Sequence, residues 1–222
     1  MDNQPEISEM DIAALNSRIQ QEICHDVLNK LSDESLMCEY KNCNSVKNQI
    51  NILKGILEKH VEPEKNEMII NEYLPQLIPA GTKGVIRGNK FNKLVEHYIM
   101  NLNLDNSKYD VCFEKKCETH MTSEIPDWYI HEKDTDKIII GMNQLDLWGG
   151  GQQLNRGSKY LINNKHNNEK SKLLCVVCKD AVFKSKKNKA YNLFDVGFRN
   201  NTLCYMNNLK NIIFMYFRIK ML

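Results

Sequence analysis

The run 122–148 constrains what this chain can fold into more than any other stretch, because it reads as a β-hairpin. Two apolar segments, 128–130 and 138–147, carry the β-branched and aromatic residues that are typical of strands. The charged segment 131–136 between them is expected to form the tip. We therefore predict a β-sheet that is organised around this hairpin.

The same hairpin carries polar side chains that suit a metal ion. Pro126-Asp127 opens it, and Gln144 and Asp146 lie in its second strand. Because side chains of a strand alternate between its faces, Gln144 and Asp146 are expected to share one face. A hairpin that sets Asp127 near them can hold a divalent ion.

Length and composition suit one α/β or α+β domain with an additional helical segment. The 222 residues can bury a core without disulfide bonds. Eight cysteines are too sparse for a disulfide framework, and no apolar leader precedes the acidic start, so we expect a reduced, intracellular protein. The apolar cluster 212–217 is far shorter than the roughly 20 residues of a membrane helix, and no membrane span is expected.

The net charge of +2 conceals an uneven distribution. Acidic residues predominate over residues 1–40, whereas lysines predominate over residues 150–190. A basic segment suits a polyanion such as DNA, because phosphates supply most non-specific affinity. A solvated lysine-rich face is the alternative interpretation.

Apolar residues at spacings of three and four predict helices in the first part of the chain. The first covers 8–31, the second starts after Asn44 or Ser45 and ends near Pro63, and the third covers 64–77, stopped by Pro75 and Pro79. The segment 32–43 is expected to be a loop.

A glycine-rich turn over 80–89 is expected next, followed by a helix over 90–101 that carries Glu96 beside its apolar stripe. The segments 109–114 and 173–179 predict strands, the second of them buried with Cys175 and Cys178 in the core. After Gly149 to Gly151 a helix is expected to begin near Gln152. The segment 200–222 has no clean period.

The expected order over 90–178 is therefore helix, strand, two-stranded hairpin, helix and strand. This αβββαβ order, together with Pro126-Asp127 and the apolar strand from Ile138, resembles the core of the PD-(D/E)XK nuclease superfamily over residues 83–180. The chain is most similar in type to a small type II restriction endonuclease, virus- or phage-encoded. The resemblance implies a restriction-endonuclease-like core with a mixed sheet over 80–190, an N-terminal helical segment over 1–79 and a tail of uncertain structure over 191–222.

The resemblance also implies Mg²⁺-dependent, site-specific cleavage of double-stranded DNA by a homodimer. In the superfamily, the Pro-Asp aspartate and an acid on the next strand hold the ion, and a lysine two positions after that acid orients or activates the water. Asp127 matches the first position. The acid position falls at Gly141 or Met142 and the lysine position at Asn143 or Gln144, so neither expected residue is present.

Three residues are candidates to fill these positions. Gln144 is a substitute for the lysine, as in some restriction enzymes, while Asp146 or Glu96 replaces the missing acid. Asp127 and Asp146 are then the expected metal ligands. Side chains of the helix after the glycines suit base edges or phosphates of DNA, and the candidates are Gln152, Gln153, Asn155, Arg156 and Lys159.

Two other classes of function stay open. With a degenerate site, the chain is a non-catalytic DNA-binding or regulatory protein of the same fold. The third interpretation is a zinc-stabilised interaction module, built on Cys38 and Cys43 or on Cys112, Cys117 and His120.

Overall fold

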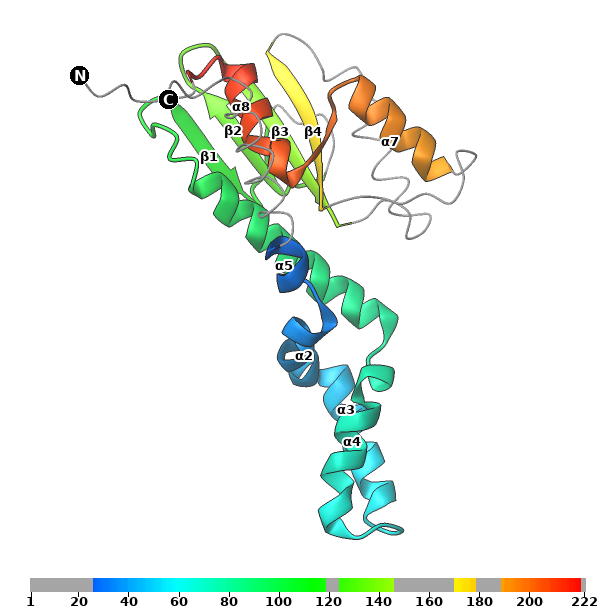
Figure 1. Cartoon of the computed structure of the whole chain (residues 1–222). Coiled ribbons are helices and arrows are strands. Elements are labelled where there is room, and N and C mark those ends of the chain that lie inside the picture. Colours follow the sequence, from blue (N-terminus) through cyan, green and yellow to red (C-terminus); the bar gives the residue numbers. More distant parts are fainter. Residues whose placement is uncertain (1–25, 119–123, 146–169, 179–188, 221–222) are drawn as a thin grey trace, which may run out of the picture. The chain divides into compact units, whose positions relative to one another are not determined.

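The computed structural model describes residues 26–118, 124–145, 170–178 and 189–220 (Figure 1). The chain divides into two compact units, and the boundary falls inside one helix, after Phe91. One unit is Leu28–Phe91, called here the helical unit; the other contains the residues from Asn92 onward together with Met1–Val27, and is called the sheet unit. The fold is mixed α/β with a five-stranded mixed sheet, as the sequence predicts at this level.

The helical unit contains α2 (Asp33–Asn42), α3 (Asn44–Leu57), α4 (Pro63–Leu77) and the first part of α5 (Ala80–Met100). The predicted helices over 44–62 and 64–77 are confirmed by α3 and α4. Buried apolar side chains from these helices form one cluster, which consists of Leu36, Tyr40, Val46, Leu74 and Ile78. Of the predicted helix over 8–31, residues 26–30 are described and are helical.

Three expectations about this unit were wrong. The expected loop 32–43 is helix α2, which begins where the Ser32 side chain accepts a hydrogen bond from Ser35 N. Pro75 lies inside α4 instead of ending it, in a helix whose neighbouring Leu74 is buried. The expected turn over 80–89 is part of the continuous helix α5, since the cost of each glycine, about 1 kcal/mol, does not interrupt it.

An ion pair in the helical unit gives a prediction about pH. Lys83 Nζ donates to Asp33 Oδ2 at 3.0 Å, and this bond lowers the pKa of Asp33 below its ordinary value of 3.8. A lowered pKa in the folded state means that the stabilisation is present above about pH 4 and lost as pH falls through the folded-state pKa. Because Asp33 is largely exposed, Asp33→Asn is expected to cost about 0.5 kcal/mol at pH 7 and nothing at pH 2.

Urea unfolding of both proteins at the two pH values checks this expectation. Glu34→Gln is the matched control, since Glu34 lies in the same first turn of α2 and forms no ion pair with any described residue. An equal loss at both pH values would contradict the assignment to the Lys83 ion pair.

The sheet unit contains β1 (Tyr109–Phe113), β2 (Trp128–Glu132), β3 (Lys137–Gln144), β4 (Ser171–Val177) and β5 (Leu203–Tyr205), in that spatial order (Figure 1). The first three strands are antiparallel, β4 is parallel to β3 and β5 is parallel to β4. The predicted hairpin and the predicted strands over 109–114 and 173–179 are thereby confirmed, with ends that differ by up to two residues. The exception is the end of β3, which lies at Gln144, whereas the predicted end at Leu147 falls outside the described residues.

The chain after β4 adds elements that the sequence pattern left unassigned. Helix α7 (Lys189–Arg199) precedes β5, and a short 3₁₀ turn (Met206–Asn208) leads from β5 into α8 (Leu209–Phe217). The buried face of α8 is formed by Leu209, Ile213, Phe214 and Phe217. The period was obscured because Ile212, Met215 and Tyr216 make the remaining faces of this helix apolar as well.

The sheet is buried on both faces around β3, whose residues from Ile138 to Gln144 are all buried. One face packs Ile138, Ile140 and Met142 against side chains of β4 and β5. Cys175 belongs to this cluster and Cys178 is also buried, which confirms both as core cysteines. Within the described segments, no helix has the length and apolar character that crossing a membrane requires.

Candidate functional site

Asp127 lies immediately before β2, between β1 and β3. Its backbone joins both neighbours: Glu114 N donates to Asp127 O at 3.0 Å, and Asp127 N donates to Gly141 O at 3.1 Å. Its side chain completes the contact, because Asn143 N donates to Asp127 Oδ2 at 2.6 Å. The half-buried carboxylate is therefore fixed at the end of the hairpin that is remote from its tip.

Asn143 is a buried polar residue of β3 that the sequence analysis did not single out as a candidate. Its Oδ1 atom accepts a hydrogen bond of 3.0 Å from Nε1 of the fully buried Trp128. Trp128 pairs with Gly141, so its indole and the Asn143 side chain lie on the same face of the hairpin. Through its backbone and its side chain, Asn143 thus connects the aspartate to the indole.

Strand alternation separates the two pairs of positions in β3 that the sequence left as alternatives. Gly141 and Asn143 share the face that Trp128 covers, whereas Met142 and Gln144 share the opposite face. Asp127 precedes β2, where alternation no longer fixes the side chain, and its Oδ2 atom accepts from Asn143 N. In a motif of the kind that the sequence suggests, an acid and a lysine on the face of Met142 would stand at Met142 and Gln144.

Both residues at these positions are buried. Met142 has an exposed fraction of 0% and belongs to the apolar cluster, while Gln144 retains 7%. The thioether of Met142 is a soft ligand that does not suit Mg²⁺, and β3 contains no Asp or Glu. An acid for this site must come from another residue.

Of the two residues predicted to supply that acid, Glu96 is described by the structure and Asp146 is not. Glu96 is exposed on α5 and forms no hydrogen bond or ion pair with any described residue, so no contact joins it to Asp127. Asp146 lies outside the described residues. The predicted DNA contacts lie outside them as well, namely Gln152, Gln153, Asn155, Arg156 and Lys159.

A lysine elsewhere in the sheet does not replace the one that the motif lacks. Lys172 is half-buried in β4, and desolvation lowers its pKa. It pairs with Ile139, which lies five residues before Gln144 in β3. Trp128 pairs with Gly141, so Asp127 is level with Met142, three residues or roughly 10 Å along the strand from Ile139. Lys172 lies two strands away from Asp127, on the face of the sheet opposite to Met142.

The described cysteines that were considered as zinc ligands do not form a complete set of ligands. Among the residues that the structure describes, no group of three or more His, Cys, Asp and Glu side chains is arranged to hold a metal ion. Cys112 instead hydrogen-bonds to its cross-strand neighbour Tyr129, which raises the pKa of Tyr129 to about 12. Cys117 is buried, and His120 lies outside the described residues.

The Trp128–Asn143 contact gives a prediction about stability. Asn143→Leu leaves the indole N–H buried without an acceptor, and an unsatisfied buried donor costs about 1–3 kcal/mol. We expect the free energy of unfolding to fall by about 2 kcal/mol in urea titrations. In a Trp128→Phe background, where that donor is absent, the same substitution is expected to cost less than half as much; an equal cost in both backgrounds would contradict the role of this bond.

Comparisons of the chain with protein-family models, with curated proteins and with solved structures find no match in any of the three.

Proposed function

We propose that this chain is a Mg²⁺-dependent, site-specific endonuclease for double-stranded DNA with a restriction-endonuclease-like core. The observation that carries the proposal is the position of Asp127. Its carboxylate is fixed by Asn143 N at the open end of an antiparallel hairpin, and the helix that the αβββαβ order expects between β3 and β4 falls outside the described residues. Helix α5 precedes the antiparallel strands β1 to β3, and β4 follows in parallel to β3.

The chemistry of phosphodiester cleavage explains why this carboxylate matters. Mg²⁺ takes oxygen ligands and commonly uses only one or two protein carboxylates, with waters and substrate phosphates completing its shell. Asp127 suits that role, because its carboxylate is half-buried and is held in place by the bond from Asn143 N. When bound, the ion neutralises charge on the scissile phosphate and lowers the pKa of the attacking water.

Other residues of the chain have supporting roles in this proposal. Gln144, at the end of β3 next to Asn143, orients the attacking water through its amide. Asp146 or Glu96 supplies the second acid, and the basic segment 150–190 contacts DNA phosphates. Two copies act as a homodimer, so that each copy cleaves one strand, inside the cell where the DNA substrate lies.

One observation favours a second candidate, a DNA-binding or regulatory protein that does not cleave. Met142 stands at the acid position with an exposed fraction of 0%, packed in the apolar core. If neither Asp146 nor Glu96 completes the site, the bond from Asn143 N gives Asp127 a structural role in the hairpin. Binding without cleavage is then the function of this surface.

Plasmid DNA distinguishes the two candidates. Purified protein incubated with supercoiled plasmid and Mg²⁺ is expected to give discrete fragments, and EDTA is expected to prevent their formation. DNA that is retarded in a gel but stays intact, at any Mg²⁺ concentration, would favour the binding protein.

A further inference from the structure

A pocket lies at the end of the sheet opposite to Asp127. It has a volume of about 550 Å³ and is lined by the connector from Leu102 to Tyr109 and by residues of α8 and the segment that follows it. Tyr109, at the start of β1, pairs with Glu132, which is the last residue of β2. Asp127 lies just before the first residue of β2, five positions or roughly 17 Å from Glu132. This pocket, called here the α8 pocket, is therefore separate from the candidate nuclease site.

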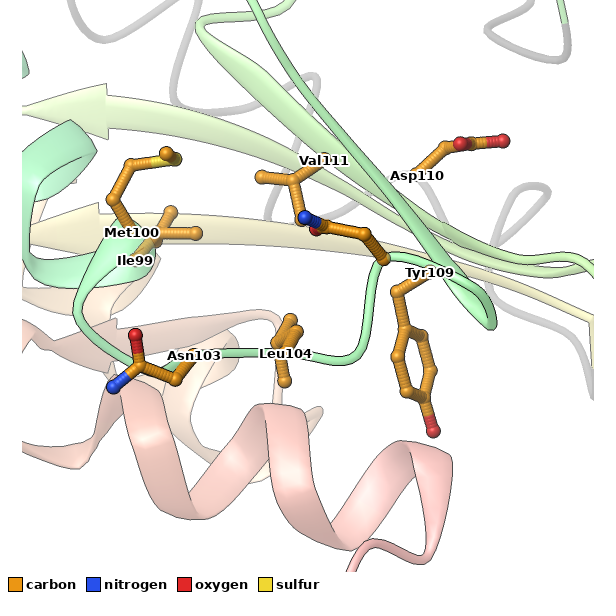
Figure 2. A pocket seen from close by; sticks show the side chains of 8 residues that line it. Ile99, Met100, Asn103, Leu104, Tyr109, Asp110 and Val111 are labelled. Atoms are coloured by element: carbon orange, nitrogen blue, oxygen red, sulfur yellow. The ribbon is translucent and has the colours of Figure 1, made fainter.

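The connector that forms one wall of the α8 pocket is itself held against α8. Tyr109 is directed toward that helix (Figure 2), and its ring lies 5.3 Å from the ring of Phe217. Tyr109 also donates to Glu132 Oε1 at 3.1 Å. A neighbouring pocket of about 450 Å³, shown in Figure 2, lies on the α5 side of the same connector and shares Asn103, Leu104 and Tyr109 with the α8 pocket.

The α8 pocket is strongly basic. Four cationic side chains line it, namely Lys108, Lys210, Arg218 and Lys220. Within the described residues, none of the four forms an ion pair with a carboxylate. The acidic residue of the lining is Asp105, whose Oδ1 already accepts hydrogen bonds from Ser107 N and Oγ, at 2.9 and 2.6 Å. The lining therefore carries a large excess of positive charge that its own carboxylate does not neutralise.

Arg218 lines this pocket from a backbone position that favours glycine. It follows α8 in the left-handed conformation, with φ 56°, and Ile219 N donates back to Phe214 O at 2.9 Å. Helices commonly end in this way with glycine, because a side chain in the left-handed region is strained. Strain of this kind persists where it positions a functional group, and here it places a guanidinium at the pocket.

The rest of the lining is mostly apolar, with Asn103 as a polar exception. Leu104, Phe214 and Ile219 contribute side chains beside the cations, and Lys210 Nζ lies 5.3 Å from the centroid of the Phe214 ring. The volume falls within the range of small-molecule pockets, about 300–1,000 Å³, and exceeds what a single inorganic anion fills. Arginine and lysine recognise phosphate oxygens through charge-assisted hydrogen bonds, while apolar walls accept an organic group.

We propose that the α8 pocket binds a nucleoside phosphate, either as a free nucleotide or as the phosphorylated end of a nucleic-acid strand. The phosphates contact Arg218, Lys210 and the flanking lysines, and the nucleoside lies against Leu104 and Ile219. The proposal does not rest on the nuclease function, because it uses none of the residues near Asp127 and its test reads binding in the absence of Mg²⁺.

Isothermal titration calorimetry with the full chain in EDTA tests the proposal. The probes are inorganic phosphate, AMP, ATP, and an octanucleotide with and without a 5′-phosphate. Saturable binding is expected, with ATP tighter than AMP and both tighter than inorganic phosphate. A 5′-phosphorylated octanucleotide that binds more tightly than ATP identifies a strand end as the ligand, and the reverse order identifies a free nucleotide.

Two substitutions separate recognition from folding. Lys210→Gln is expected to weaken ATP binding about tenfold, which is the effect of losing one charge-assisted hydrogen bond. Lys93 is an exposed lysine of α5 outside the pocket, and Lys93→Gln is expected to leave ATP binding unchanged. Arg218→Gly is expected to weaken ATP binding about tenfold while raising the melting temperature by about 2 °C, since glycine relieves the strained backbone. Asn201→Gly, at another left-handed position with φ 54°, is the matched control and is expected not to alter binding.

Three results would overturn the proposal. The first is the absence of saturable binding by every probe. The second is equal affinity for inorganic phosphate and the nucleotides, which would leave the apolar wall without a role. The third is an Arg218→Gly protein that binds ATP as well as the wild type does.

Discussion

Replacing Gly141 with alanine is expected to lower the free energy of unfolding by about 3 kcal/mol or more, whereas a Cβ atom at Gly55, Gly81, Gly84 or Gly88 would meet open space. A Cβ atom at this position would lie 1.9 Å from Trp128 Cε2 and 2.3 Å from Cδ2 and Cζ2. Trp128 is fully buried, and its Nε1 atom is bonded to Asn143 Oδ1, so the indole cannot move aside without breaking that bond. Far-UV circular dichroism during urea unfolding measures the loss.

A double-mutant cycle separates this steric explanation from a general weakness of glycine substitution in strands. In a Trp128→Leu background the indole is absent, and the added methyl group at position 141 is expected to cost less than 1 kcal/mol. The coupling energy between positions 128 and 141 should therefore exceed about 2 kcal/mol, in the range measured for residues in direct contact. An equal cost of Gly141→Ala in both backgrounds would contradict the packing described for this hairpin.

Replacing Asp127 with asparagine is expected to reduce Mg²⁺-dependent cleavage of DNA by about a hundredfold or more, because the site loses a charged ligand for the ion. Asparagine is preferred to alanine for this test, since its amide oxygen can still accept the hydrogen bond from Asn143 N that the Oδ2 atom of Asp127 accepts at 2.6 Å. The expected change in unfolding free energy is consequently small, about 1 kcal/mol. Initial rates of plasmid cleavage, together with urea unfolding, provide both readouts.

Asp134→Asn is the matched control for this substitution. Asp134 lies in the exposed tip of the same hairpin, at the end remote from the candidate site. Its substitution removes the same charge as Asp127→Asn. Cleavage by Asp134→Asn is expected to equal that of the wild type. Equal cleavage by Asp127→Asn would remove Asp127 from the metal site.

The parts of the fold that the sequence predicts are those whose burial leaves a local pattern. The run Leu173–Val177 is apolar throughout because β4 lies between β3 and β5 and is covered on both faces. The hairpin is recognisable because its two apolar segments flank a charged tip. Helix α3 follows from the apolar spacing after Asn44, which needs no knowledge of its partners.

The sequence failed to predict α2 and the first part of α5, because the local pattern of these segments does not show the packing that makes them helical. The three glycines at positions 81, 84 and 88 indicate a turn, yet α5 passes through them with open space where each Cβ would stand. Helix α2 is a short helix that buries only Leu36 and Tyr40, so its apolar stripe is too small to distinguish from a loop. In both cases packing within the helical unit outweighs the local propensity.

In the candidate site as well, features that depend on neighbours in the sequence could be predicted, and contacts between distant residues could not. Pro126-Asp127 is visible in the sequence as the opening of a hairpin. The role of Asn143 was not visible, because its bonds to Asp127 and Trp128 depend on the register between β2 and β3. That register also separates the pair Gly141 and Asn143 from the pair Met142 and Gln144, which spacing alone left as alternatives.

The central claim is that Asp127 holds a divalent cation at the open end of the hairpin, and the most direct test is to locate the cation by paramagnetic broadening of amide NMR signals with Mn²⁺. The account predicts that substoichiometric Mn²⁺ broadens the amide signals of Trp128, Asn143 and Gln144 first. Asp127→Asn is expected to abolish this local broadening. The amide signals of the hairpin tip are expected to stay sharp in both proteins. Broadening that is centred elsewhere, or that is the same in Asp127→Asn as in the wild type, would contradict it.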